Sequence, residues 1–203
     1  MSTDTAVAKA PKRARGVQRV AELLDAGAAL FAENGYEATT MTQIAQRAGA
    51  SIGSLYQFFP SKDVLAEALF GRYVEHVASL LEGLERRAHG LSPVELADKL
   101  VDVMLDVRSD RDAAAALSGS VSGIVERRKP LRGATRRQIA AILRAANPIL
   151  PEKTAADTAV MIAHVLKIVP TLAREQEDGG QALVAQARKM LAAYIENVVR
   201  RPA

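Results

Sequence analysis

The stretch from Thr40 to Phe59, TMTQIAQRAGASIGSLYQFF, constrains the fold more than any other part of the chain. It predicts two short helices joined by a tight turn. Thr40 can cap the first helix, and Gln43 three residues later completes a capping box. Gly49 stands where a helix stop is expected, because glycine enters the left-handed region at little cost. This pattern is typical of the helix-turn-helix, whose second helix enters the DNA major groove.

Geometry alone leaves another interpretation open, an ordinary helical corner in an all-α protein. A family resemblance favours DNA binding, and it rests on a gapless set of residues: Phe31, Gly35, Thr40, Ile44, Ala45, Ala48, Gly49, Ser51, Gly53, Tyr56, Phe59 and Lys62. Together they resemble the TetR family of transcriptional regulators over about residues 17–77. One position departs from the pattern, because many members carry His or Tyr where Phe58 stands. The resemblance therefore does not assign a phosphate contact to Phe58.

The fold class expected from composition is all-α. Ala, Leu, Val and Ile dominate, aromatic residues make up 4% of the chain, and almost no alternating strand pattern is present. The resemblance implies a three-helix DNA-binding head followed by a helical domain for effector binding and dimerisation, about nine helices in all. We expect a disordered basic arm at 1–14, the head at 15–62 and the second domain at 63–203.

Apolar periodicity and helix-stop residues predict the individual helices. The expected ranges are about 15–34, 40–48, 51–59, 61–90, 92–108, 130–146, 152–178 and 180–199. Gly35 is expected to end the first of these helices. Pro170 is expected to kink or loosen the helix in which it lies.

The basic arm precedes the first helix. An eleven-residue stretch without an acidic side chain carries Lys9, Lys12, Arg13, Arg15 and Arg19. Such an arm can lie along phosphates or reach into the minor groove. A solubilising tail is an equally good interpretation.

Side-chain chemistry assigns roles in the second helix of the motif. Gln57 can form a bidentate pair with adenine, and Ser54 can donate or accept at a base edge. Ile52 and the Tyr56 ring offer apolar contact with thymine methyl groups. The expected base contacts are Ile52, Ser54, Tyr56 and Gln57. The expected phosphate contacts are Thr40, Thr42, Ser51, Gly53, Lys62 and Arg15.

The last two helices are the expected dimer surface, because they carry more apolar surface than one helical pair needs. The residues expected there are Ala159, Ala163, Ile168, Leu191, Tyr194 and Ile195. The resemblance implies a four-helix bundle built from two subunits. The alternative is that these residues serve the core of one subunit, and the sequence does not divide them between the two roles.

The resemblance also implies an effector pocket among the middle helices. Tyr194 is the only aromatic residue between Leu91 and Ala203, so aliphatic and methionine side chains must provide most of the lining. This composition favours a small apolar or mixed effector over a flat polyaromatic cation. The candidate lining residues are Met104, Met161 and His164, although a core or interface histidine is the commoner case.

Catalytic and metal-binding patterns are not recognisable. The chain has no cysteine, and its three histidines are isolated from other ligands, so we expect no metal, no cofactor and no enzyme activity. A formal charge of +4 permits nucleic-acid binding. No apolar run approaches the ~20 residues of a membrane span, and no signal-peptide core is present. We therefore expect a cytoplasmic protein without a membrane partner.

The sequence as a whole predicts a sequence-specific DNA-binding homodimer. The expected role is a repressor that occupies a palindromic operator and is released by a small molecule. Two alternatives remain open at this point. One is an activator of the same family, and the other is a non-specific DNA-coating protein driven by the basic arm.

Overall fold

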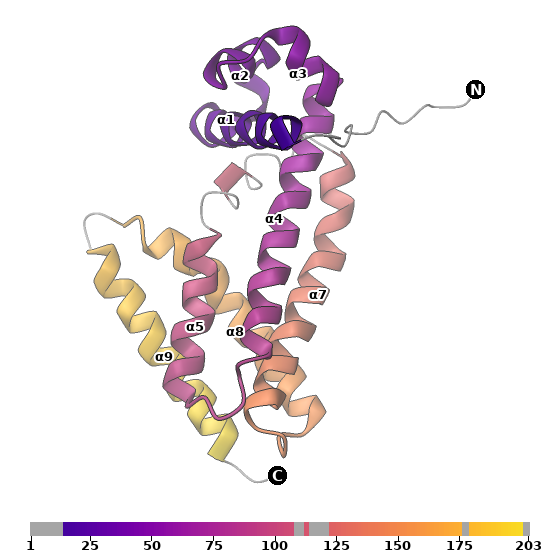
Figure 1. Ribbon diagram of the computed structural model, residues 1–203. Coiled ribbons are helices and arrows are strands. Elements are labelled where there is room, and N and C mark those ends of the chain that lie inside the picture. The colour runs from indigo at the N-terminus through magenta and orange to yellow at the C-terminus, as the bar shows by residue number, and fades with distance from the viewer. Residues whose placement is uncertain (1–13, 108–111, 114–121, 176–178, 201–203) are drawn as a thin grey trace. The chain divides into compact units, whose positions relative to one another are not determined.

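The computed structural model describes residues 14–107, 112–113, 122–175 and 179–200, and Figure 1 shows their arrangement into helices. Eight helices and no strand occur within these ranges, so the all-α fold is confirmed. Most of the basic arm lies outside the described residues. The chain forms two compact units, Met1–Val74 with Ser109–Arg128 and Glu75–Arg108 with Lys129–Ala203. Helices α4 (Lys62–Glu85) and α7 (Ser122–Ala146) each contribute residues to both units.

Helix α1 (Ala14–Ala38) is the first helix of the N-terminal unit. Gly35 interrupts it with φ 80° and ψ 167°, which confirms the expected helix stop. Leu23, Leu30 and Phe31 are buried on its inner face. Thr39, also buried, donates from its hydroxyl to the carbonyl oxygens at positions 30 and 35. These bonds fix the end of α1 just before the helix-turn-helix begins.

Helices α2 (Met41–Arg47) and α3 (Ile52–Phe58) form the helix-turn-helix. The capping box is confirmed, because the Thr40 hydroxyl accepts from the Gln43 N–H at 3.2 Å while the Gln43 side chain accepts from the Thr40 N–H at 2.8 Å. Gly49 adopts φ 59° in the turn between the helices. Ser51 then caps α3 by accepting from the Ser54 N–H at 3.2 Å.

Helix α4 (Lys62–Glu85) follows the motif, and Leu65 in its first turn lies close to Gly27 of α1. The Ser61 hydroxyl caps it by accepting from the Val64 N–H at 3.2 Å. A Cβ atom added to Gly27 of α1 would lie 2.7 Å from Leu65 Cδ2. The absence of a side chain at Gly27 is therefore what lets Leu65 approach α1.

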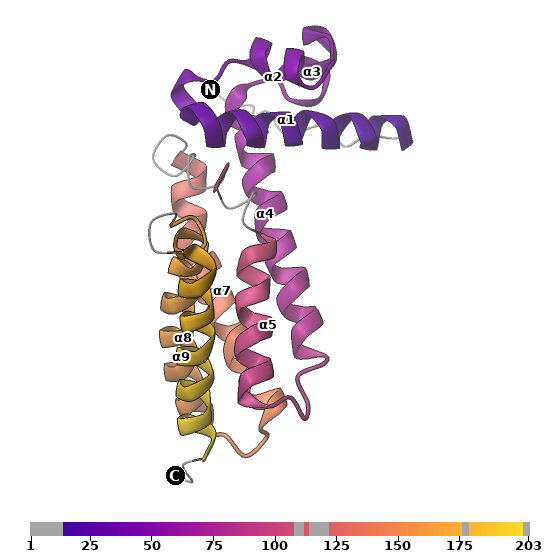
Figure 2. The ribbon, with the colours of Figure 1, turned by 90° about the vertical axis from the view of Figure 1, so that its left-hand side faces the viewer.

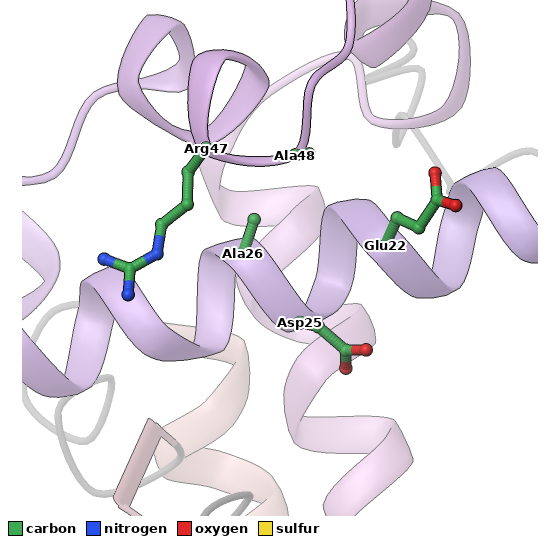
Figure 3. Close-up of a pocket in the computed structure, with 5 residues that line it drawn as sticks. All are labelled: Glu22, Asp25, Ala26, Arg47 and Ala48. Atoms are coloured by element: carbon green, nitrogen blue, oxygen red, sulfur yellow. The ribbon is translucent and has the colours of Figure 1, made fainter.

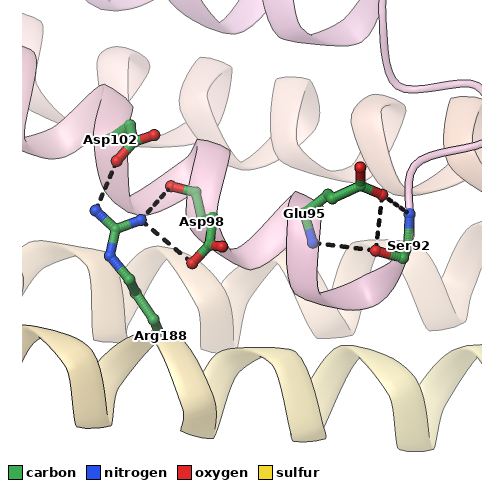
Figure 4. A network of polar contacts seen from close by, with 5 residues as sticks. All are labelled: Ser92, Glu95, Asp98, Asp102 and Arg188. Atoms are coloured by element: carbon green, nitrogen blue, oxygen red, sulfur yellow. Dashed lines mark hydrogen bonds and ion pairs between the residues drawn. The ribbon is translucent and has the colours of Figure 1, made fainter.

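The second unit is built around α5 (Pro93–Asp106), α8 (Glu152–Leu172) and α9 (Gly180–Arg200), which lie side by side in Figures 1 and 2. Arg188 connects α9 to α5. It donates to the Asp98 carbonyl oxygen at 2.8 Å and to Asp102 Oδ1 at 2.6 Å (Figure 4). At the start of α5, Ser92 and Glu95 form a second capping box.

Three expected helix bounds in this part of the chain are wrong. Helix α4 ends at Glu85 rather than near position 90. Helix α7 (Ser122–Ala146) begins eight residues before Pro130, and the helix continues across that proline. Helix α8 ends at Leu172 rather than near position 178. The absence of a side chain at Gly180 lets the start of α9 lie against the end of α8, since an added Cβ atom would stand 2.7 Å from the Leu172 carbonyl oxygen.

Helix α8 also differs from the expectation that no apolar run reaches the length of a membrane span. By length and composition alone, its residues 152–172 are sufficient to cross a bilayer. One face of the helix is, however, buried within the second unit, where its apolar side chains pack against other residues. The buried residues are Ala155, Thr158, Ala159, Ile162, Leu166, Val169 and Pro170. This is the pattern of an amphipathic helix that buries one face within its own unit.

Candidate nucleic-acid interface

Helix α3 has one buried side and one exposed side. Leu55 is fully buried, and Phe59 just beyond the helix is 2% exposed, so these two residues attach α3 to the unit. Gln57 is exposed and lies about 160° around the helix axis from Leu55. Its amide therefore points away from the protein, as reading a base edge requires.

The four expected base contacts form two adjacent pairs on α3. Ile52 and Tyr56 are 41% and 48% exposed and stand four residues apart. Ser54 is half-buried and stands three residues from Gln57. Residues three and four apart are neighbours on a helix surface, so each pair makes one continuous contact area.

The expected phosphate contacts on the motif surround α3. Thr42, Ser51 and Gly53 are exposed, and nothing lies within 4 Å of a Cβ atom added to Gly53. The hydroxyl of Thr40 is already engaged, since it accepts from the Gln43 N–H and donates to Gln43 Oε1 at 2.9 Å. Arg15 is exposed in the first turn of α1.

Lys62 has partners that the sequence did not reveal. Its ammonium nitrogen lies 2.8 Å from the Tyr36 carbonyl oxygen, 3.4 Å from that of Glu37 and 3.0 Å from that of Thr39. The same nitrogen lies 4.2 Å from the centre of the Tyr36 ring. The Tyr36 hydroxyl donates to Asp63 Oδ1. The only sequence feature that pointed to this arrangement is Tyr36, which directly follows the Gly35 helix stop.

A surface cavity of about 360 Å³ lies between α1 and the end of α2 (Figure 3). Its lining consists of Glu22, Asp25, Ala26, Arg47 and Ala48. The charged side chains are paired with other residues, since Glu22 forms an ion pair with Arg19 at 2.9 Å and Asp25 with Arg72 at 2.6 Å. This cavity contains none of the expected effector-pocket residues.

The three expected effector-pocket residues differ in their surroundings. Met104 is 8% exposed in the packed face of α5, whereas Met161 is 54% exposed on α8. His164 is exposed as well, and its Nε2 lies 3.3 Å from Arg136 Nη2. Because a guanidinium group can only donate, His164 Nε2 accepts this bond.

The expected interface residues divide into two groups. Ala159, Leu191 and Ile195 are at most 1% exposed, so they belong to the core of the subunit, as the alternative interpretation has it. Ala163 is half-buried, whereas Ile168 is 50% and Tyr194 36% exposed. Met190 of α9 is a second exposed methionine, at 51%.

Exposed apolar side chains form one stripe on each of the last two helices. Met161 and Ile168 are two helical turns apart on α8, and Met190 and Tyr194 are one turn apart on α9. We call these four residues the α8–α9 apolar face. The seven-residue spacing of Met161 and Ile168 and the four-residue spacing of Met190 and Tyr194 are the sequence features that could have identified this face.

Within the described ranges, no group of three or more acidic or histidine side chains is placed to hold a metal ion.

Family comparisons match both parts of the chain. The profile of bacterial regulatory proteins of the tetR family matches residues 23–69. The profile of the tetracyclin repressor-like C-terminal domain matches residues 92–195, about half of the chain.

Two curated relatives each match about a third of the chain. The HTH-type transcriptional repressor KstR2 of Rhodococcus jostii is 47% identical over 78 residues, which is 34% of this chain and 37% of that protein. The A-factor receptor protein of Streptomyces griseus is 36% identical over 72 residues, 36% of this chain and 26% of that protein. The chain thus spans between about a quarter and little more than a third of the length of these relatives.

Solved structures extend the likeness of fold to nearly the whole chain. The structure of Salmonella enterica GusR superposes with a TM-score of 0.72, covering 94% of this chain and all of that one. Its sequence identity is 18%, so this likeness concerns the fold alone.

Proposed function

The chain belongs to the TetR family of bacterial regulatory proteins, and on that basis we propose that it is a homodimeric, sequence-specific DNA-binding repressor. A small molecule releases it from its operator. The proposed parts are a basic arm at 1–14, a DNA-binding head at 15–62 and an effector-binding and dimerisation domain at 63–203. A repressor of this kind acts in the cytoplasm and needs no catalytic residues.

The exposed face of α3 is the observation that carries the proposal. The helix is held by Leu55 and Phe59, while Gln57 and Tyr56 are left exposed without contributing to the core. A seven-residue helix gains little stability from its own hydrogen bonds, so its existence depends on this buried side. The outer side is then available to read bases, with Gln57 donating to and accepting from adenine.

Phosphate contacts position such a helix in the groove. We propose this role for the residues surrounding α3 and at the start of α1, namely Thr40, Thr42, Ser51, Gly53 and Arg15. The N-terminal ends of α2 and α3 add backbone N–H groups, which favour anions.

The α8–α9 apolar face supports the proposed dimer. Met161, Ile168, Met190 and Tyr194 are between 36% and 54% exposed in the single chain. Two copies that bring these stripes together remove them from water, and a two-fold dimer presents two copies of α3. Its operator is then an imperfect palindrome with related half-sites.

The proposed ligand release is supported by a relative, since one of the matching proteins is the A-factor receptor protein of Streptomyces griseus. A ligand that binds only the DNA-incompetent conformation shifts the population away from the operator. The mainly aliphatic composition of the second unit favours a small apolar or mixed molecule.

The decisive experiment is selection of binding sites from a random duplex library by the purified full-length chain. We expect enrichment of one palindromic motif, and binding to that motif should persist in excess random duplex at physiological salt. Binding that random duplex abolishes would instead support the non-specific DNA-coating alternative. Transcription from a promoter carrying the motif then separates repression from activation.

The release step requires a separate screen on the same protein. Small apolar metabolites and acyl compounds are tested for a thermal shift, and those that bind are tested for release of the selected duplex. We expect at least one compound to raise the unfolding temperature and lower DNA affinity together. Compounds that stabilise the protein without releasing DNA would count against ligand-controlled repression.

A further inference from the structure

The ammonium group of Lys62 is engaged by the end of α1. An ammonium group has three N–H donors, and the carbonyl oxygens of Tyr36, Glu37 and Thr39 can account for all of them. These carbonyls lie in the short segment that follows the Gly35 helix stop, so Lys62 donates to backbone groups just beyond the regular part of α1. Contact between Lys62 and a phosphate would compete with bonds that already hold α1.

Tyr36 connects the same place to the next residue of α4. Its ring is 7% exposed and lies 5.4 Å from the ring of Phe31, centre to centre. Its hydroxyl donates to Asp63. Burial and this hydrogen bond to Asp63 raise the pKa of Tyr36 well above its usual range, so the phenol keeps its proton. Lys62 and Asp63 thus hold one tyrosine from two sides.

The connection between this cluster and α3 is short. Only Phe59, Pro60 and Ser61 separate the end of α3 from Lys62. Phe59 is buried, and the ring of Pro60 restricts its own φ. A connector this short and constrained transmits the position of Lys62 to the C-terminal end of α3.

We propose that Lys62, Tyr36 and Asp63 form a clamp that fixes the orientation of α3 on α1, so that Lys62 serves DNA binding as a positioning residue. This inference rests on the proposed DNA-binding function and replaces the phosphate contact expected for Lys62. Two consequences separate the roles. A phosphate contact contributes to the salt dependence of binding, whereas a clamp changes affinity equally at all salt concentrations.

The test uses the full-length chain and the duplex that it selects from a random library. Affinity is measured for the wild type and Lys62→Met over a series of salt concentrations. We expect about a tenfold loss at every concentration, because charge-assisted hydrogen bonds within the protein are lost. The slope of log affinity against log salt should stay at the wild-type value. A slope shallower by about 0.9 would identify a phosphate contact and overturn the clamp.

Arg15→Gln is the matched control for the slope. Arg15 is exposed, carries one positive charge and is proposed to contact a phosphate. Its removal should make the slope shallower by about 0.9. Detection of that change shows that the measurement resolves the loss of one contact.

Tyr36→Phe tests the clamp with a smaller change that preserves the ring. Because Tyr36 is buried, its hydroxyl has no direct route to DNA, yet the clamp predicts about a threefold loss of affinity with an unchanged slope. Wild-type affinity in both Tyr36→Phe and Lys62→Met would overturn the proposal.

Amide hydrogen exchange gives a second readout that needs no DNA. In Lys62→Met, amides of residues 52–58 should exchange faster than in the wild type, while those of α5 keep their rates. Unchanged exchange in α3 would overturn the clamp. Should the wild-type chain select no DNA motif, the proposed function fails, and the exchange rates still decide the clamp.

Discussion

Arg47, the last residue of α2, forms a two-pronged ion pair with Glu33 of α1. Arg47 Nη1 lies 2.5 Å from Glu33 Oε2, and Nη2 lies 2.7 Å from Oε1. Both side chains are roughly half exposed, so solvent weakens the attraction. The pair nevertheless joins α2 to α1 with a defined geometry, since two parallel bonds restrict the orientation of both groups.

The first prediction concerns the pH dependence of this pair. Hydrogen bonding to Arg47 lowers the pKa of Glu33, so folding favours the ionised carboxylate. The resulting stabilisation is present above the unfolded-state pKa of about 4.3 and is lost as pH falls through the lower pKa of the folded state. The difference in unfolding temperature between wild type and Glu33→Gln should therefore shrink below about pH 4. A difference independent of pH would contradict this account.

The sequence predicted the local structure of the first unit well because each feature there has a short-range cause. Gly35 and Gly49 mark positions of positive φ, and Thr40 meets its capping partner Gln43 three residues later. The contacts of Lys62 have no such signal. Its partner Tyr36 is 26 residues away, and only the packing of α4 on α1 brings the two together.

In the second unit, the sequence likewise did not predict which apolar residues are buried. Met190 is 51% exposed and its neighbour Leu191 is 1% exposed, although both are large apolar residues. Apolar spacing identified α9 but did not show which stripe faces α5 and α8 and which is left outside. That choice depends on how three helices pack, so core and interface residues could not be separated in advance.

Gly49 is predicted to be required for its backbone conformation. It adopts φ 59°, and nothing lies within 4 Å of an added Cβ atom, so the effect of Gly49→Ala is one of conformation alone. We expect a loss of about 1–2 kcal/mol in the free energy of unfolding, measured by chemical denaturation. An unchanged free energy would show that the turn relaxes into another conformation.

Gly53 is predicted to behave in the opposite way. It lies in the first turn of α3 with open space around an added Cβ atom. Gly53→Ala should stabilise the protein by up to about 1 kcal/mol, because alanine loses less conformational freedom in a helix. DNA affinity should nevertheless fall if this backbone approaches a phosphate. Stabilisation with unchanged affinity would remove Gly53 from the proposed contacts.

The proposed dimer predicts that a charge on the α8–α9 apolar face produces monomers. Met190→Glu places a carboxylate beside Tyr194, where burial against a second copy would leave it unpaired. We expect a monomer in analytical ultracentrifugation with normal helical content. Affinity for the palindromic duplex should fall by about a hundredfold, since each half-site is then bound alone.

Two variants of α9 control for the added charge and for the core. Ala185 is exposed and lies about 140° around the helix from Met190, so Ala185→Glu should remain dimeric. Leu191→Ala should lower the free energy of unfolding by about 3 kcal/mol, because it empties part of the subunit core. A monomeric Ala185→Glu would show that charge on any side of α9 prevents association.

The last prediction concerns base reading by Gln57. This side chain lies opposite the buried Leu55 on α3, and its amide can donate to and accept from one adenine. Gln57→Ala should relax the preference at one base pair of each half-site by about 1–3 kcal/mol and leave the other positions of the selected motif intact. Gln46→Ala is the matched control, because Gln46 is an exposed glutamine on α2 rather than on the reading helix. An unchanged motif in Gln57→Ala would show that α3 presents another side chain to the bases. Because Lys62, Tyr36 and Asp63 are not proposed to contact bases, variants at these positions should select the same DNA motif as the wild type and bind it more weakly.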